Sequence, residues 1–143
     1  MRNCLFILSI ILVTNLIACS STKNMNNDAM FNGAWELEYI SGPRIAFNGL
    51  YPNKKPRISF DKENSKAQGT NSCNGYSADF SLDGNNISFG QPGSSTLMYC
   101  GEGEKVFLNM MQKIDTYEID SDGKLVLKSN DVALMRFHNV PKP

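Results

Sequence analysis

Hydrophobic and polar residues alternate along much of the chain, with the period of two that a half-buried β-strand requires. The alternation is clearest over 35–40 and 76–82, and it stops at turn-forming residues such as Ser41-Gly42-Pro43 and Asp83-Gly84. Further short strands are expected over 57–60, 66–69, 86–89, 95–99, 116–119, 124–128 and 132–137, with turns at Asp122-Gly123 and Asn130-Asp131. This pattern predicts an antiparallel sheet of many short strands.

One segment, 102–116, has a helical period instead. Its apolar residues lie on one face of an amphipathic helix and are Val106, Phe107, Met110, Met111 and Ile114. Glu102 and Glu104 stand at its start, where the helix dipole favours negative charge. The expected fold class is therefore mainly β with one α-helix (α+β). We expect a small antiparallel curved sheet or open barrel, packed by a single amphipathic helix.

The first residues have the proportions of a secretory signal. A short positive start is followed by an apolar run over 5–16, which is shorter than the roughly 20 residues needed to cross a bilayer. The run ends in Leu16-Ile17-Ala18-Cys19, which resembles the lipobox of bacterial lipoproteins. The resemblance implies that residues 1–18 are removed and that Cys19 carries lipid, which anchors the protein to a membrane. The alternative is an ordinary signal peptide with a chance cysteine.

Residues 19–30 comprise the lipidated Cys19 and a tether rich in Ser and Asn, which cannot bury enough apolar surface to order itself. The single folded domain is expected over 31–140. Ser20 follows the lipid cysteine, and by resemblance to bacterial sorting rules this indicates the outer membrane. The expected location is the cell envelope.

Composition narrows the chemistry further. Fourteen basic and fourteen acidic residues cancel, so nothing suggests a nucleic-acid partner, which would require a basic face. The basic residues are scattered, which gives no support for charge-driven membrane association. His138 is the only histidine, so every two-histidine metal site is excluded. No metal site and no cofactor are expected, because the methionines lie at positions typical of core residues.

Two cysteines, Cys73 and Cys100, remain in the expected domain. An exported protein meets an oxidising environment, so an even pair indicates a disulfide. The alternative is two reduced, buried thiols that act as small apolar residues.

The surroundings of these cysteines resemble a known family. The runs Gly69-Thr70-Asn71-Ser72-Cys73-Asn74-Gly75-Tyr76, Thr96-Leu97-Met98-Tyr99-Cys100 and Glu104-Lys105-Val106-Phe107 are similar to the META domain of HslJ-like, heat-shock-associated lipoproteins. Ser72, Ala78 and Tyr99 depart from the usual family residues. The resemblance implies a curved antiparallel fold with one helix, an envelope setting and a link to stress or toxic-compound resistance. It supplies no catalytic residues.

Two classes of function stay open. The first is a non-catalytic envelope lipoprotein that binds an envelope protein, a lipid or a small hydrophobic compound. Its expected contact surface comprises Phe47, Leu50, Tyr51 and Asn74. The first three lie in 45–52, which reads as a long loop with exposed aromatic residues. Asn74 could line a pocket near the cysteine sulfurs, and the alternative is that Asn74-Gly75 is simply a turn. The alternative is a thiol- or metal-dependent envelope enzyme that uses the region of Cys73 and Cys100.

Overall fold

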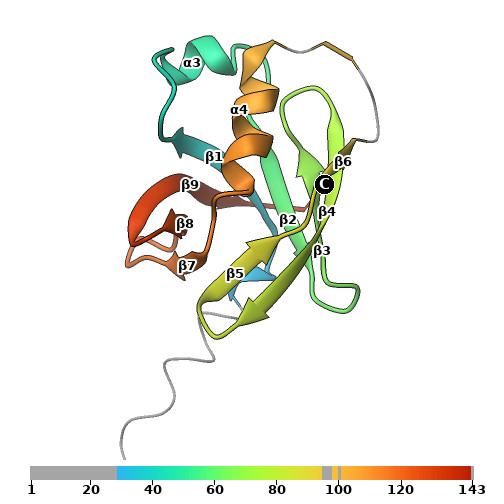
Figure 1. Cartoon of the computed structure of the whole chain (residues 1–143), viewed down its shortest axis with the longest axis vertical. Coiled ribbons are helices and arrows are strands. Elements are labelled where there is room, and N and C mark those ends of the chain that lie inside the picture. The colour runs from blue at the N-terminus through green and yellow to red at the C-terminus, as the bar shows by residue number, and fades with distance from the viewer. Residues whose placement is uncertain (1–28, 95–97, 100, 143) are drawn as a thin grey trace, which may run out of the picture.

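The computed structural model describes residues 29–94, 98, 99 and 101–142, and in them nine strands form one antiparallel sheet. The strands are β1 (Ala34–Ile40), β2 (Arg57–Asp61), β3 (Lys66–Thr70), β4 (Gly75–Asp83), β5 (Asn86–Phe89), β6 (Gly93–Ser94), β7 (Thr116–Ile119), β8 (Leu125–Ser129) and β9 (Val132–Val140). Their order is β3-β2-β1-β9-β8-β7-β5-β4-β6, and β3 also pairs with β4. The pairings therefore form a ring of eight strands (Figure 1), and the expected strongly curved sheet is confirmed.

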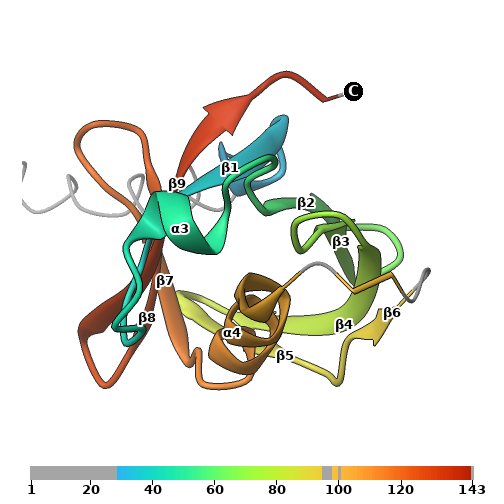
Figure 2. The ribbon, with the colours of Figure 1, turned by 90° about the horizontal axis from the view of Figure 1, so that it is seen from above.

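The ring is weakest between β5 and β7. A single residue pair, Asn86 with Thr116, joins these two strands. The helix α4 (Glu102–Met111) packs against the sheet at this side and lies between β7 and β4 when seen from above (Figure 2). Just after the helix, the Gln112 amide donates to the carbonyl of Gly90 at 2.9 Å and accepts from Gln91 at 3.0 Å. The residue after the helix thereby gives a hydrogen-bond partner to the Gly90 carbonyl, which lies beyond the pairing of β5 with β7.

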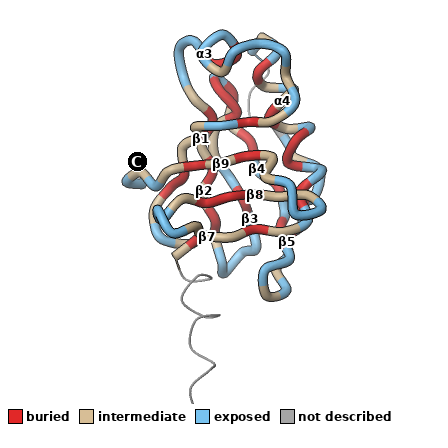
Figure 3. The backbone as a smooth tube through the Cα atoms, turned by 90° about the vertical axis from the view of Figure 1, so that its left-hand side faces the viewer, coloured by how far each residue is buried: buried red, intermediate tan, exposed pale blue. Residues whose placement is uncertain are grey.

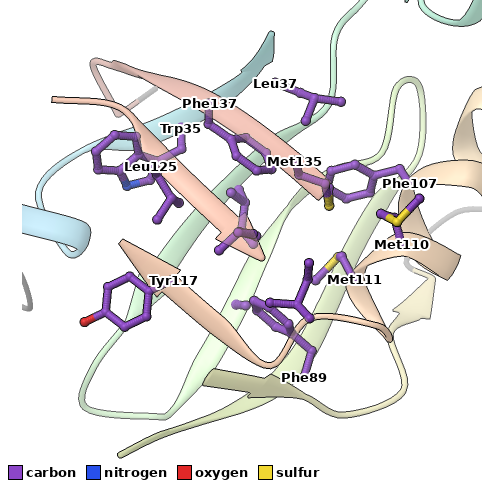
Figure 4. Close-up of a cluster of buried hydrophobic side chains, with 14 of the residues drawn as sticks. Trp35, Leu37, Phe89, Phe107, Met110, Met111, Tyr117, Leu125, Met135 and Phe137 are labelled. Atoms are coloured by element: carbon purple, nitrogen blue, oxygen red, sulfur yellow. The ribbon is translucent and has the colours of Figure 1, made fainter. Parts of the chain in front are cut away.

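Alternation along the strands separates the core from the surface, as the tube in Figure 3 shows. Inward residues of β1, β8 and β9 meet the apolar face of α4 (Figure 4). The Phe107 ring of α4 lies 5.5 Å from the ring of Tyr76 on β4 and 6.5 Å from that of Phe137 on β9, measured between centroids. Each fully buried large side chain contributes about 1.5–3 kcal/mol. This shared packing holds the helix to both sides of the ring.

The turn between β8 and β9 follows the local sequence. Ser129 pairs with Val132, so Asn130 and Asp131 form a two-residue turn, with φ of 48° and 65°. Both residues tolerate positive φ, which the twist of a tight hairpin requires. The backbone N–H of Asn130 donates to Asp115 at 2.9 Å, and this bond is the main reason that the pKa of Asp115 is lowered.

Three expectations about the elements need correction. The helix ends at Met111 and not at residue 116, because β7 begins at Thr116. Met98 and Tyr99 are not in a strand, while residues 95–97 of that expected strand lie outside the described residues. The expected loop at 45–52 contains a short helix, α3 (Phe47–Leu50).

The expected signal peptide, Cys19 and most of the tether fall within residues 1–28, which lie outside the described part of the chain. In the part that the structure describes, no helix is both long and apolar enough to span a membrane.

Candidate functional site

The loop between β3 and β4 contains buried polar side chains. Asn71 is fully buried and Asn74 is 1% exposed, and the backbone N–H of Asn71 donates to the Asn74 carbonyl at 3.0 Å. Between them Ser72 has a φ of 134°, and its hydroxyl donates to the carbonyl of Lys54 at 3.1 Å. The tight turn therefore points both asparagine side chains inward.

Both asparagine amides meet the carboxylate of Glu104 in the first turn of α4. Asn74 Nδ2 lies 2.9 and 3.1 Å from the two carboxylate oxygens, and Asn71 Nδ2 lies 2.8 Å from one of them. We call Asn71, Asn74 and Glu104 the Asn–Glu cluster. The amide donors and the N-terminal end of the helix compensate for the partial removal of this carboxylate from water.

Asn74 also fixes the backbone of a distant segment. Its Nδ2 donates to the Met98 carbonyl at 2.6 Å, and its Oδ1 accepts from the Met98 N–H at 3.1 Å. The side chains of Met98 and Tyr99 are 63% and 80% exposed. Asn74 thus fixes the backbone at Met98, in a stretch where two large apolar side chains are exposed. The sequence prediction placed Asn74 in a contact surface, but its own side chain is buried.

The expected contact segment at α3 is only partly exposed. Leu50 and Tyr51 are 5% and 3% exposed and belong to the core, so the expectation that they form a surface is wrong. Tyr51 packs against α4, where its hydroxyl donates to the carbonyl of Gly103 at 2.9 Å, and burial raises its pKa above the ordinary value. A Cβ on Gly103 would lie 2.6 Å from Tyr51, so glycine permits this close contact. Phe47 remains half-exposed, and its contact role stays a prediction.

A shallow, predominantly apolar groove of about 630 Å³ lies beside the Asn–Glu cluster. We call it the β3–β4 groove, and its lining residues are Gln68, Gly69, Thr70, Gly75, Tyr76, Ser77 and Gly93. A Cβ on Gly69 would come within 2.0 Å of the Arg57 carbonyl oxygen, so only glycine fits there. Gly93 differs, because a Cβ there would meet only the Ser77 carbonyl oxygen, at 3.8 Å. The Tyr76 phenol is buried, which raises its pKa well above the ordinary value.

Sequence reasoning missed this groove. Its available signal was the set of glycines at positions 69, 75 and 93, which lie on three different strands. Their combination becomes visible only when β3, β4 and β6 are paired.

The cysteine and histidine candidates lie in different surroundings. Cys73 is exposed in the β3–β4 loop, while Cys100 lies outside the described residues, so their disulfide stays a prediction. His138 on β9 has its ring nitrogens 3.9 and 3.8 Å from Glu36 and Glu38 of β1. Glu36 also pairs with Arg57, and Glu38 also pairs with Lys124. His138 takes no part in the Asn–Glu cluster. Within 29–94, 98, 99 and 101–142, no three His, Cys, Asp or Glu side chains are grouped to hold a metal ion.

Comparison with known proteins agrees with this architecture. A search of curated proteins found no match. The NMR structure of a protein from Burkholderia xenovorans is similar, with a TM-score of 0.60 and 17% identity over 89% of this chain and 94% of that one. The crystal structure of a DUF4847 family protein from Bacteroides vulgatus has a TM-score of 0.57 and 14% identity over 82% and 99% of the two chains. These likenesses concern the fold alone. The family model of the META domain matches residues 28–141, and the chain therefore belongs to the META domain family.

Proposed function

We propose that this protein is a non-catalytic, lipid-anchored envelope domain that binds a small hydrophobic compound in the β3–β4 groove and so contributes to stress or toxic-compound resistance. The observation that carries the proposal is the groove itself, a hollow whose exposed surface is mostly apolar. Glycines and the side chains of Gln68, Thr70, Tyr76 and Ser77 line it, but the surface that they expose there is mostly carbon, which favours an uncharged, largely apolar ligand.

The arrangement of the Asn–Glu cluster supports a binding role over a chemical one. Each of its three side chains hydrogen-bonds to another member of the cluster, and Asn74 also holds the Met98 backbone. These contacts shape the edge of the groove. A general acid or base would instead need a titratable group directed at a substrate position.

Gly93→Phe is designed to fill the groove. Gly93 lines it, and a Cβ there would meet only the Ser77 carbonyl oxygen, at 3.8 Å, so a side chain can start from this position without a backbone clash. Val132→Phe is the matched control, because Val132 is 58% exposed on β9, across the ring from the groove. Binding is followed by fluorescence titration with N-phenylnaphthylamine, an uncharged aromatic probe.

We expect the wild type and Val132→Phe to bind the probe equally, and Gly93→Phe to bind it at least about tenfold more weakly, which corresponds to about 1.4 kcal/mol. Each variant is also returned to a deletion strain, and survival is scored under heat and hydrophobic antibiotics. Gly93→Phe should fail to restore survival. Unchanged probe binding by Gly93→Phe, or no binding by the wild type, would overturn the proposal.

The membrane anchor and the disulfide form a separate part of the proposal. We expect Cys19 to incorporate palmitate and Cys73 and Cys100 to react with thiol reagents only after reduction. Intact mass of the protein from bacterial membranes, with and without reductant, measures both. A mature chain without acyl mass rejects the anchor, and ready labelling of Cys73 in the native protein rejects the disulfide.

A further inference from the structure

The segment that surrounds α3 carries an unbalanced charge. Residues 41–56 contain Arg44, Lys54 and Lys55 but no Asp or Glu, although the whole chain has equal numbers of acidic and basic residues. Arg44 and Lys54 are exposed and Lys55 is half-exposed. None of the three forms an ion pair with another residue in the described part of the chain. The segment therefore carries three cations that no ion pair within the described residues compensates.

Two apolar side chains of the same segment are also exposed to solvent, wholly or in part. Ile45 is 52% exposed and Phe47 is half-exposed, and Lys55 Nζ lies 5.8 Å from the centroid of the Phe47 ring. We call Arg44, Ile45, Phe47, Lys54 and Lys55 the basic–apolar face. Long basic side chains that keep their charged ends outside an apolar centre are typical of surfaces that rest on lipid.

The core holds this face in place from behind. Leu50 and Tyr51 are buried, and the Tyr51 hydroxyl donates to the Gly103 carbonyl of α4. The Ser72 hydroxyl donates to the Lys54 carbonyl at 3.1 Å, which ties the far end of the segment to the β3–β4 loop. Figure 1 shows α3 at one end of the domain, where the segment is open to its surroundings. The backbone of this face is thus held by the core and by the β3–β4 loop.

Basic residues are scattered along the chain as a whole, so the charge of this face comes only from the uncompensated cations of 41–56. We propose that the basic–apolar face docks on an anionic phospholipid bilayer. Arg44, Lys54 and Lys55 would contact lipid phosphates, and Ile45 and Phe47 would enter the interfacial region. A bilayer presents phosphates that move to meet the cations, so no fixed spacing of partner charges is required. Glu102 is the exposed acid of α4, and its Oε1 lies 3.6 Å from Lys105 Nζ, so it is paired within the helix.

This proposal is independent of the β3–β4 groove, because none of its five residues lines the groove. It is tested on the chain that begins at Ser20. This chain lacks Cys19 and so cannot carry the lipid, and it retains every core residue from Met30 to Phe137. The probe is sedimentation with vesicles of phosphatidylethanolamine and phosphatidylglycerol, compared with vesicles of phosphatidylcholine alone.

We expect binding to the anionic vesicles only, and loss of that binding at about 0.5 M salt, where charges are screened within a few ångströms. Each lysine near an anionic surface contributes about fivefold, so Lys54→Gln with Lys55→Gln should weaken binding by about 25-fold. The matched control, Lys113→Gln with Lys142→Gln, makes the same change in net charge at exposed positions elsewhere and should bind as the wild type does. Replacement of Lys54 and Lys55 by arginine should preserve binding.

Two further measurements make the test decisive. Ile45→Ser should weaken binding severalfold without changing its salt dependence, because it removes exposed apolar surface and no charge. Thermal unfolding by circular dichroism checks that each variant keeps its fold. Equal binding to neutral vesicles, or equal losses in the two double-lysine variants, would overturn the proposal and leave an acidic protein as the alternative occupant.

Discussion

Removing the Asn74 side chain should destabilise the protein more than the loss of a typical surface amide does. Asn74→Ala deletes the bonds to both Glu104 oxygens, at 2.9 and 3.1 Å, and both bonds to the Met98 backbone, at 2.6 and 3.1 Å. Hydrogen bonds to a charged group are worth about 1.5–3 kcal/mol, and neutral ones about 1 kcal/mol. Because water can replace part of the Met98 bonds, we expect a loss of about 3–4 kcal/mol in the free energy of unfolding.

Equilibrium unfolding in urea measures this loss, and the slope should stay unchanged if only stability is affected. The control is Asn139→Ala, which removes one exposed bond, from Asn139 Nδ2 to the Asn32 carbonyl at 2.6 Å, and should cost less than about 1 kcal/mol. A double-mutant cycle between Asn74→Ala and Glu104→Ala should give a coupling energy of about 1.5–3 kcal/mol. Equal losses for Asn74→Ala and Asn139→Ala would refute the reasoning.

Three more predictions test other contacts. Gly103→Ala should cost about 1–3 kcal/mol in urea unfolding, because its Cβ would lie 2.6 Å from both the Leu50 carbonyl oxygen and the Tyr51 ring; a neutral result contradicts the close packing of α3 on α4. Burial raises the pKa of Tyr76 above its usual 10.0, so its contribution to stability is complete below pH 10 and falls as pH rises further, which tyrosinate absorbance and unfolding at several pH values check. Cys19→Ser should release the protein from the membrane fraction, and continued retention would reject the lipid anchor.

The strands were the most predictable part of the fold. Their period of two comes directly from burial on one side of the sheet, and the expected and observed bounds of β5 and β7 agree fully. The helix was also predictable from its apolar face, although its end was set by the start of β7 at Thr116. The two-residue turn at Asn130 and Asp131 followed from residues that tolerate positive φ.

The candidate site was less predictable because it depends on contacts between distant residues. Asn74 by itself indicates a turn and Glu104 a helix start, but their contact joins residues thirty positions apart. Tyr51 looked exposed because it follows no periodic pattern, yet Gly103, fifty-two positions later, gives its hydroxyl a buried partner. The periodicity of a local sequence indicates which face of a strand or helix is apolar. It does not indicate which residues from elsewhere in the chain will contact that face.

The position of β1 has a mechanical consequence. Its chain runs from the end where the domain begins toward the end where α3 lies (Figure 1), and it has six residue pairs with β9 and two with β2. A pulling force that enters at the N-terminus and is resisted at α3 would act along the strand axis. The hydrogen bonds between β1 and its two neighbours would then bear the force together, in shear, and would not break one after another. The bond from Trp35 Nε1 to the Met30 carbonyl strengthens the start of β1, where the force is applied. A domain held at one end and docked at the other would thereby resist extension most strongly in the direction in which it is pulled.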